Sequence, residues 1–321
     1  MYSSAILDGE KEEERLSEKR KISRWIAVAV LAVVVVSSIA FIYFSQQGQQ
    51  TTYTINQKGS DTMLILAQKW AEEYMKKHPE AQIAVSGGGS GTGIAALINK
   101  QVDIADASRE ITDKEIEQAK ANGVNPTEWK VALDGISVIV HPDNPVSELS
   151  LDQLKAIYNG SFTNWRQLGG NDAVIVVYGR QTNSGTYVYW KEHVLKNQDY
   201  RNDMQALNGN ADIVEAIAKD ENGIGYVGVA YASQRSKEVN ILKVKKDSSS
   251  PGILPTPETV TDGTYPISRY LYVYTNGIPK GVVKDYVRWI LGPEGQKIVE
   301  QVEYIPLPNE VINEQWAKLI D

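Results

Sequence analysis

The stretch AVIVVYGRQTNSGT at residues 173–186 passes from a nearly continuous apolar segment, through a polar loop with glycine, into a helix that bears Tyr187 and Trp190. An apolar run of this kind is expected of a strand covered on both faces. The same order of strand, loop and helix occurs around residues 59–62 and 87–93. This alternation predicts an α/β fold for the chain from residue 55 onward.

Short polar motifs mark where further helices begin and end. Thr112 with Glu115, and Ser150 with Gln153, form capping-box patterns, in which two side chains three residues apart satisfy backbone N–H groups at a helix start. A helix earlier in the chain is expected to end at His78. Additional strands are predicted at residues 82–86, 225–230, 239–244 and 269–274, and additional helices at residues 94–99, 282–291 and 293–302.

Three loops place hydroxyl and glycine residues where predicted helices begin. They are Ser60-Asp61-Thr62, Ser90-Gly91-Thr92 and Ser184-Gly185-Thr186. Helix N-termini carry unpaired backbone N–H groups and the positive end of the helix dipole, which suit an anion. Arg180 adds a guanidinium that can bind an oxyanion through two hydrogen bonds. Together the loops predict an anion site, although in any single loop Ser and Thr are equally well explained as helix caps.

The run WIAVAVLAVVVVSSIAFIYF at residues 25–44 has 20 residues without charge, Gly or Pro, which is long enough to cross a bilayer as a helix. Four Lys/Arg residues between positions 19 and 24 precede it, so residues 1–24 are expected in the cytoplasm and the rest outside. A cleaved signal peptide is the alternative, but its apolar core is shorter, about 7 to 15 residues, and ends at a small-x-small site. We therefore expect an uncleaved anchor and a polar tether at residues 45–54.

Composition excludes several classes of function. The chain of 321 residues has no cysteine, so disulfides, zinc–thiolate and iron–sulfur sites, a cysteine nucleophile and a lipidated N-terminal cysteine are excluded. Residues 1–24 carry six Lys/Arg and six Asp/Glu, and residues 25–44 carry none, so the net charge of −7 belongs to the exterior part. No exterior stretch has the clustered cations that nucleic-acid binding requires.

Six motifs lie in order along the exterior part of the chain. They are GSDTM at 59–63, GGGSGTG at 87–93, VDIADASR at 102–109, GRQTNSGT at 179–186, NGIGYVGVAYA at 222–232 and GPEGQKIVEQVEYIPLP at 292–308. Together they resemble the phosphate-binding proteins of ABC phosphate transporters, the PstS family. The resemblance spans almost the entire exterior part, and six ordered motifs are far more specific than any one of them.

The resemblance implies an α/β protein with the two-lobe, periplasmic-binding-protein-like fold (type II) behind an N-terminal transmembrane helix. Lobe 1 would comprise residues 55–138 and 265–321, and lobe 2 residues 139–264, with two strands joining them. The protein would be a binding module without cofactor or catalysis, anchored in the cell membrane with its binding domain outside. It would close on inorganic phosphate by a hinge movement and deliver it to the permease and ATPase subunits of an ABC transporter.

The resemblance also implies the residues that contact phosphate. They are Thr62, Met63 through its backbone N–H, Ser90, Arg180, Ser184, Gly185 and Thr186, with Ser60 as a further donor. Many family members place an aspartate where this chain has Ser108 or Arg109, and that carboxylate accepts the proton of hydrogen phosphate and so rejects sulfate. Asp61 is a candidate for the missing acceptor; alternatively, it caps its helix and pairs with Arg109. Arg109 is itself a candidate for a second charged ligand.

Three alternatives stay open. Sulfate, molybdate or arsenate share the tetrahedral geometry of phosphate. A serine hydrolase or phosphatase would use Ser90 or Ser184, but His78, His141 and His193, the only histidines, offer no evident paired base and fit no metal-ligand spacing. A sensor would signal through the spanning helix, although a cytoplasmic tail of 24 residues has no room for an output domain.

Two further patterns are interpreted as structural. Gly223, Gly225 and Gly228 spell GxGxxG, but no helical pattern opens directly after them, which argues against a nucleotide-binding fingerprint. Tyr187 and Trp190 have the spacing of one buried helix face, so we expect them in the core rather than in a ligand platform.

Overall fold

The computed structural model describes residues 15–16, 18–21, 23–26, 29–38 and 52–320. Contacts divide the chain into two units, Met1–Thr51 and Thr52–Asp321, and each unit is considered by itself. Most of the predicted cytoplasmic tail and of the predicted tether lies outside the described residues.

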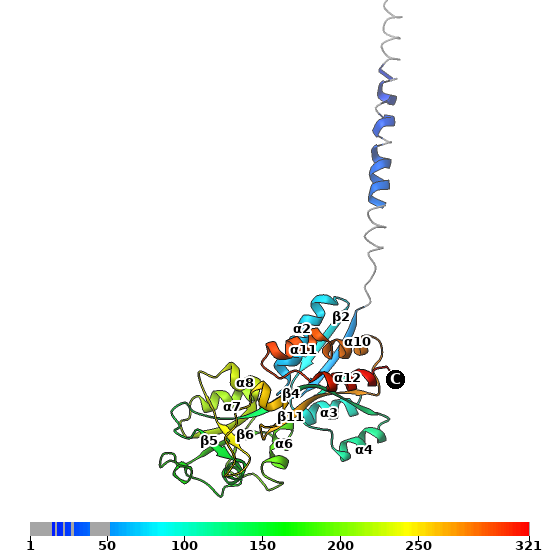
Figure 1. Cartoon of the computed structure of the whole chain (residues 1–321). Helices are drawn as coiled ribbons and strands as arrows, with labels where there is room; N and C mark the ends of the chain where they lie inside the picture. Colours follow the sequence, from blue (N-terminus) through cyan, green and yellow to red (C-terminus); the bar gives the residue numbers. More distant parts are fainter. Residues whose placement is uncertain (1–14, 17, 22, 27–28, 39–51, 321) are drawn as a thin grey trace, which may run out of the picture. The chain divides into compact units, whose positions relative to one another are not determined.

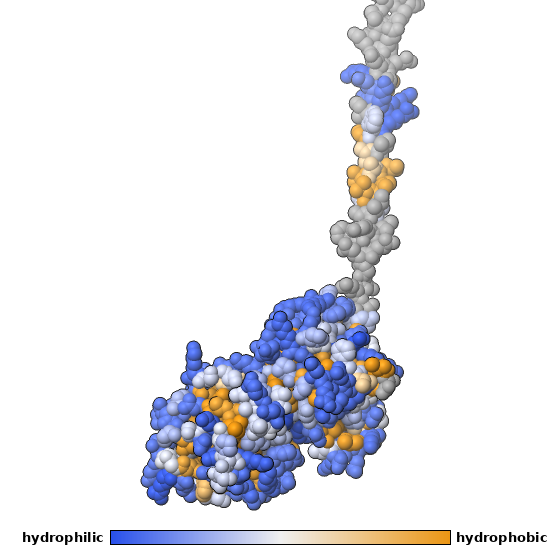
Figure 2. Space-filling model, viewed as in Figure 1, coloured by the Kyte–Doolittle hydropathy of each residue, from blue (hydrophilic) through white to orange (hydrophobic). Residues whose placement is uncertain are grey.

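In the described part of the first unit, the helix Glu18–Ser38 is long and apolar enough to cross a membrane, by length and composition. Along its length it changes from hydrophilic to hydrophobic residues (Figure 2). The predicted span at residues 25–44 overlaps this helix as far as Ser38, and residues 39–44 lie outside the described part. A signal sequence meets the same criterion, so the uncleaved anchor stays a prediction.

The first lobe of the compact unit is built from both of its ends. β1 (Tyr53–Gly59) lies parallel between β2 (Ala81–Ser86) and β3 (Ile104–Ala107), and β11 (Ser268–Asn276) pairs antiparallel with β3. A strand from the C-terminal part of the chain thus continues the sheet that the N-terminal part begins. The helices of this lobe are α2 (Leu64–Lys77), α3 (Ser90–Ile98), α4 (Asp113–Ala121), α10 (Gly281–Ile290), α11 (Pro293–Gln301) and α12 (Asn309–Lys318).

The long strand β4 (Pro126–Val140) connects the two lobes. Residues 126–135 pair antiparallel with β11, whereas residues 136–140 pair antiparallel with β8 (Gly223–Gly228). In Figure 1, β4 and β11 lie between the helices of the two lobes. The two-lobe α/β fold predicted from the sequence is confirmed, and the boundaries proposed at residues 138 and 264 stay predictions.

The second lobe extends the sheet beyond β8. β8 pairs parallel with β6 (Val176–Arg180), and β6 pairs parallel with β7 (Gln205–Leu207). β9 (Asn240–Ile241) pairs with β4, and β5 (Glu148–Ser150) with β10 (Lys243–Lys245) forms a separate two-stranded sheet. The helices are α5 (Leu151–Tyr158), α6 (Gly185–His193), α7 (Asn210–Ile217), α8 (Val229–Gln234) and α9 (Pro257–Thr261), with a 3₁₀ turn at Trp165–Leu168.

Aromatic packing fixes α6 on the core of the second lobe. Trp190 is fully buried and stacks on Tyr226 of β8, with ring centroids 4.2 Å apart. Tyr187 stacks on Tyr200 at 4.4 Å. Such pairs contribute about 0.5–1.5 kcal/mol each beyond the area that they bury. The prediction that this helix face packs in the core is confirmed for Trp190, whereas Tyr187 is only half-buried. These contacts hold α6 against the rest of the second lobe.

Two predicted strands differ from the structure. β6 begins only at Val176, and Val174, predicted inside a strand covered on both faces, is 65% exposed. The strand predicted at residues 239–244 is split into β9 and β10, because the chain changes partner there from β4 to β5. The helices α7, α8, α9 and α12 were not predicted.

The glycine triplet of the GxGxxG pattern lies inside a strand. Gly223, Gly225 and Gly228 are all buried in β8, and α8 opens directly after them at Val229. The prediction that no helix follows was therefore wrong. The pattern still does not form a phosphate-binding loop, because such a loop lies between a strand and a helix, whereas these glycines are part of the strand.

Candidate functional site

The three loops with anion-binding character meet between the lobes. Thr62 Oγ1, just before α2, lies 2.8 Å from Thr186 Oγ1 in α6. Ser90 Oγ, at the start of α3, lies 3.3 Å from Ser108 Oγ. A Cβ atom on Gly185 would lie 2.3 Å from Ser90 Oγ, so α6 approaches α3 as closely as only glycine permits. Loops from both lobes therefore face one another across one small region.

The first loop depends on a glycine at the end of β1. Gly59 has a φ of 152°, and a Cβ atom there would lie 2.1 Å from the carbonyl oxygen of Asp106. This close approach lets Ser60 N–H donate to Asp106 O at 2.8 Å. The N–H of Met63, predicted to bind phosphate, donates to Ser60 O at 3.1 Å. What the loop offers the cleft in this structure is therefore the buried hydroxyl of Thr62 rather than that N–H.

The loop before α6 reaches across to the loop before α3. Asn183 Nδ2 donates to Gly88 O at 2.8 Å, and the N–H of Gly91 donates to Asn183 O at 3.0 Å. Gly89 has a φ of 91°, and a Cβ atom there would lie 2.6 Å from Asn183 O. Glycine at this position is thus required both for the backbone conformation and for the contact between the lobes.

Ser184 is the N-cap of α6. Its Oγ accepts hydrogen bonds from the N–H groups of Thr186 at 3.2 Å and Tyr187 at 3.4 Å. A hydroxyl that accepts these bonds keeps its own proton for another acceptor. The capping and anion-binding explanations of Ser184 are therefore compatible.

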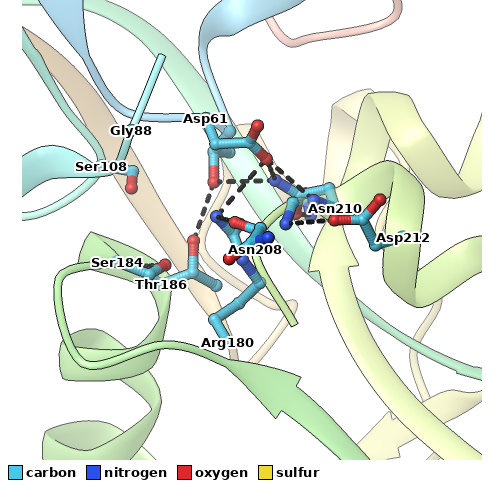
Figure 3. Close-up of polar contacts among 12 residues, drawn as sticks. Asp61, Gly88, Ser108, Arg180, Ser184, Thr186, Asn208, Asn210 and Asp212 are labelled. Carbon is cyan, nitrogen blue, oxygen red and sulfur yellow. Dashed lines mark hydrogen bonds and ion pairs between the residues drawn. The ribbon is translucent and has the colours of Figure 1, made fainter. Parts of the chain in front are cut away.

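Arg180 ends β6, and its side chain is 1% exposed. Nη2 donates to Asn208 O at 2.6 Å and lies 3.4 Å from Asp61 Oδ2 (Figure 3). Nε and Nη1 are buried without a hydrogen-bond partner among the described residues. Burial lowers the pKa of Arg180 from its ordinary value, while Asp61 opposes that change, and a guanidinium stays protonated at neutral pH. A buried cation with unpaired N–H groups is costly unless an anion receives them.

Asp61 joins the first lobe to a helix of the second. Its Oδ2 accepts from the backbone N–H and from Nδ2 of Asn210, both at 2.8 Å, and Figure 3 shows these contacts together with Arg180. Asn210 is the first residue of α7, so Asp61 caps a helix of the opposite lobe and not its own helix α2. Its cationic partner is Arg180. The alternative in which Asp61 caps its own helix and pairs with Arg109 is wrong.

Ser108 and Arg109 occupy different surroundings. The N–H of Ser108 donates to Ser90 Oγ at 3.0 Å, so this residue lies directly against the α3 loop. Arg109 forms a bidentate ion pair with Glu115 of α4, with N–O distances of 2.8 and 2.7 Å. Glu115 also completes the capping box of Thr112, which confirms that predicted helix start. As phosphate ligands, Ser108 and Arg109 stay predictions.

Three buried groups at this site were missed by the sequence analysis. Asn210 Nδ2 lies 3.4 Å from Thr62 Oγ1 in addition to its bond with Asp61. Arg269 Nη2 donates to Thr186 Oγ1 at 2.9 Å, and Asp134 of β4 holds the same guanidinium. Asn210 follows a glycine at a helix start, which was a usable signal. The antiparallel register that brings Arg269 to Asp134 had no signal in the sequence.

The arrangement can bind a dehydrated oxyanion. It combines one guanidinium with hydroxyl groups from Ser60, Thr62, Ser90, Ser184 and Thr186, all of them buried. Ser60 Oγ, like two nitrogens of Arg180, has no hydrogen-bond partner among the described residues. Hydroxyl, guanidinium and helix N-terminal donors together suit negatively charged oxygens, and Asp61 places an acceptor beside them.

The candidate serines lack a catalytic base among the residues in contact with them in the described chain. Ser90 Oγ contacts Ser108, and Ser184 Oγ contacts backbone N–H groups. His193 stacks on Tyr189, with ring centroids 4.0 Å apart. Within the described residues no group of three or more His, Cys, Asp or Glu could hold a metal ion. The geometry gives no support to a hydrolase or phosphatase.

Known proteins resemble this chain in sequence and in fold. A model of the PBP superfamily domain matches residues 45–294. The phosphate-binding protein PstS of Pseudomonas aeruginosa is 31% identical over 291 residues, which cover 85% of this chain and 89% of that protein. A substrate-binding protein from Clostridium perfringens with bound phosphate has a TM-score of 0.72 and 32% identity, over 80% of this chain and 100% of that one. An ABC-type phosphate transport receptor from Vibrio cholerae has a TM-score of 0.65 and 26% identity, over 79% and 100%.

Proposed function

The chain belongs to the PBP superfamily and, within it, to the PstS family of phosphate-binding proteins, and from this premise we propose that it captures inorganic phosphate between its two lobes and delivers it to an ABC-type phosphate transporter. It acts as a binding protein and not as an enzyme. The relatives support this function, since one is named a phosphate-binding protein, another holds bound phosphate, and a third is a phosphate transport receptor.

One observation carries the proposal, namely the side chain of Arg180. It is buried between the lobes, and two of its nitrogens have no hydrogen-bond partner in the part of the chain that the structure describes. Hydroxyl groups from both lobes lie beside it. A phosphate oxygen would satisfy those nitrogens, and the opposite charges would offset the cost of burying the guanidinium. The residues that we assign to phosphate are Ser60, Thr62, Ser90, Arg180, Ser184, Gly185 and Thr186, with Asp61 as the acceptor of its proton and with Ser108 and Arg109 around them. The N–H of Met63 would join them only if it released the carbonyl oxygen of Ser60.

Location and partners follow from the same function. We assign the binding unit to the extracytoplasmic side of the cell membrane, with the helix Glu18–Ser38 as a single-pass anchor. Permease and ATPase subunits of the transporter would then receive phosphate from it. The acidic exterior does not oppose the binding of an anion, because buried local dipoles and not the overall field provide the attraction.

Isothermal titration calorimetry of the full chain in detergent, with phosphate, sulfate and molybdate as separate ligands, tests the proposal. Phosphate should bind most tightly. Arg180→Ala should weaken phosphate binding by at least about 1.5–3 kcal/mol, the contribution of a charge-assisted contact. Arg201→Ala is the matched control. The side chain of Arg201 is 9% exposed and forms two hydrogen bonds to the carboxylate of Asp203, at 2.5 and 2.6 Å, but it lies outside the cleft.

Two results would contradict the proposal in different ways. Equal affinity of wild type and Arg180→Ala would move the anion site elsewhere. Tighter binding of sulfate or molybdate than of phosphate would keep the site and replace its ligand by another tetrahedral oxyanion.

A further inference from the structure

A buried ion pair lies where β4 leaves the first lobe. Asp134 and Arg269 are directly opposite each other in the antiparallel pairing of β4 with β11, one residue before Gly135 and Ser268 end that pairing. Asp134 is fully buried and Arg269 is 6% exposed. Nε and Nη2 of Arg269 donate to Asp134 Oδ2 at 3.1 and 2.8 Å. The pair therefore occupies the crossing point between the lobes.

The same guanidinium contacts the anion loops of both lobes. Nη1 of Arg269 donates to the carbonyl oxygen of Ser108 in the first lobe at 2.8 Å. Nη2 donates to Thr186 Oγ1 in the second lobe at 2.9 Å. Because a guanidinium is planar and rigid, these contacts and the bond to Asp134 fix one relative position of the three groups. A change in the angle between the lobes would break at least one of them.

Further contacts attach the ion pair to the second lobe. Asp134 Oδ1 accepts from the N–H of Val229, the first residue of α8, at 3.0 Å. The Arg269 guanidinium carbon lies 5.3 Å from the centre of the Tyr189 ring in α6, and the Tyr189 hydroxyl donates to Ser268 O at 2.7 Å. Two helices of the second lobe are thus fastened to the strands that connect it to the first.

The contact with Thr186 also orients a hydroxyl group in the anion site. A guanidinium can only donate, so Thr186 Oγ1 must accept the bond from Arg269. The proton of Thr186 is then directed to another acceptor, either Thr62 Oγ1 at 2.8 Å or an anion oxygen. Arg269 therefore orients the hydroxyl group of Thr186 in the site, although it is not one of the residues that we assign to the anion.

We propose that Arg269, held by Asp134, is a positioning residue that latches the closed state of the two lobes and slows the release of the bound anion. The proposal rests on the proposed function, since the anion is taken to be phosphate. It differs from a stabilising role, because the contacts with Ser108 of the first lobe and Thr186 of the second require the two lobes to lie close together. The bond to Asp134 instead joins neighbouring strands.

The test follows lobe closure and phosphate release in the full chain in detergent. Because the chain has no cysteine, Glu117→Cys in α4 and Asp152→Cys in α5, both exposed positions, can carry a pair of fluorescent labels, one on each lobe. Energy transfer between them is recorded with and without inorganic phosphate, and stopped-flow mixing gives the association and dissociation rate constants. The variants are Arg269→Lys and the double variant Arg269→Met with Asp134→Asn, which leaves no unpaired buried carboxylate.

We expect both variants to release phosphate about ten- to a hundredfold faster, the effect of losing charge-assisted hydrogen bonds, with an association rate changed by less than about threefold. Arg269→Lys should keep the unfolding temperature near that of wild type, since a lysine can still pair with Asp134 but cannot reach Ser108 and Thr186 together. Arg201→Met, which removes an ion pair within the second lobe alone, should leave both rate constants unchanged.

The outcomes separate this inference from the proposed function. If wild type binds phosphate and both Arg269 variants release it at the wild-type rate, the latch is wrong and the function stands. If Arg269→Lys releases phosphate as slowly as wild type while the double variant releases it faster, the ion pair of Arg269 with Asp134 has only a structural role. If wild type does not bind phosphate, the proposed function is wrong. The latch is then tested by the distance between the two labels without phosphate. The Arg269 variants should lengthen this distance, and an unchanged distance would show that the latch is wrong as well.

Discussion

Asp61 brings a carboxylate to a site otherwise made of donors. Oδ2 is engaged by Asn210 and lies 3.4 Å from Arg180. Protonated phosphate can donate to a carboxylate, whereas sulfate has no proton to give at neutral pH, so a carboxylate in contact with the ligand favours phosphate and repels sulfate. The family resemblance implies an aspartate where this chain has Ser108 or Arg109, and Asp61 is the acceptor that we assign in its place.

We expect Asp61→Asn to reduce the preference for phosphate over sulfate by at least about tenfold, since one charge-assisted bond is lost and one repulsion removed. Competition calorimetry with both anions measures the ratio of affinities. Asp103→Asn is the control, because Asp103 accepts a bond from the N–H of Asn56 at 2.8 Å away from the cleft. An unchanged ratio in Asp61→Asn would rule out the acceptor role.

Asp106 is a buried carboxyl two residues before Ser108. Burial raises its pKa to about 7, although a hydrogen bond from Gln57 Nε2 at 2.7 Å opposes the rise. The folded chain therefore holds a proton on Asp106 that the unfolded chain loses near pH 4. The contribution of Asp106 to the free energy of unfolding is therefore fully present below about pH 4 and is lost as the pH rises through 7.

Asp106→Asn should abolish this part of the pH dependence. Wild type should lose about 3 kcal/mol more free energy of unfolding than the variant between pH 5 and pH 8, at roughly 1.4 kcal/mol per pH unit up to pH 7. The new amide can also donate to Gln57 Oε1, which is buried without a partner among the described residues. Urea unfolding at pH 5, 6, 7 and 8 measures the two curves, and parallel curves would show that Asp106 does not titrate in this range.

At the scale of elements, α6 closes against α3 only because its first residue is Gly185. A Cβ atom there would lie 2.3 Å from Ser90 Oγ and 2.7 Å from Ser108 Oγ. We expect Gly185→Ala to weaken phosphate binding by about tenfold or more, because the lobes cannot close fully around the ligand. The unfolding temperature without phosphate should change little, since an opened cleft gives the methyl group room. A variant that binds as tightly as wild type would show that closure needs no such approach.

The sequence predicted where helices start better than which strands pair. A helix start depends on residues that are close in the sequence, whereas strand pairing can join residues that are far apart in it. The capping boxes at Thr112 and Ser150 are formed by residues three positions apart, and both are present in the structure. β11 instead pairs with β3 and β4, more than a hundred residues earlier. The loop residues of the site could therefore be named in advance, whereas Arg269, which enters the site through that pairing, could not.

At the scale of the whole molecule, the anion site is confined to one unit of the chain. Every contact described for it lies between Gly59 and Arg269, within the unit Thr52–Asp321. The helix Glu18–Ser38 belongs to the other unit. The residues that we assign to phosphate therefore all belong to one unit of the chain, and the candidate anchor belongs to the other.

A chain that starts at residue 52 should be soluble and should bind phosphate within about a factor of two of the full chain, because the contacts that hold the ligand are all retained. The full chain should stay with the membrane after alkaline carbonate extraction, since a spanning helix of some 20 apolar residues is held by the hydrophobic effect and not by charge. N-terminal sequencing of the mature protein distinguishes an anchor from a signal peptide: recovery of an intact N-terminus supports the anchor, and a mature chain beginning beyond residue 44 would show that the helix is removed.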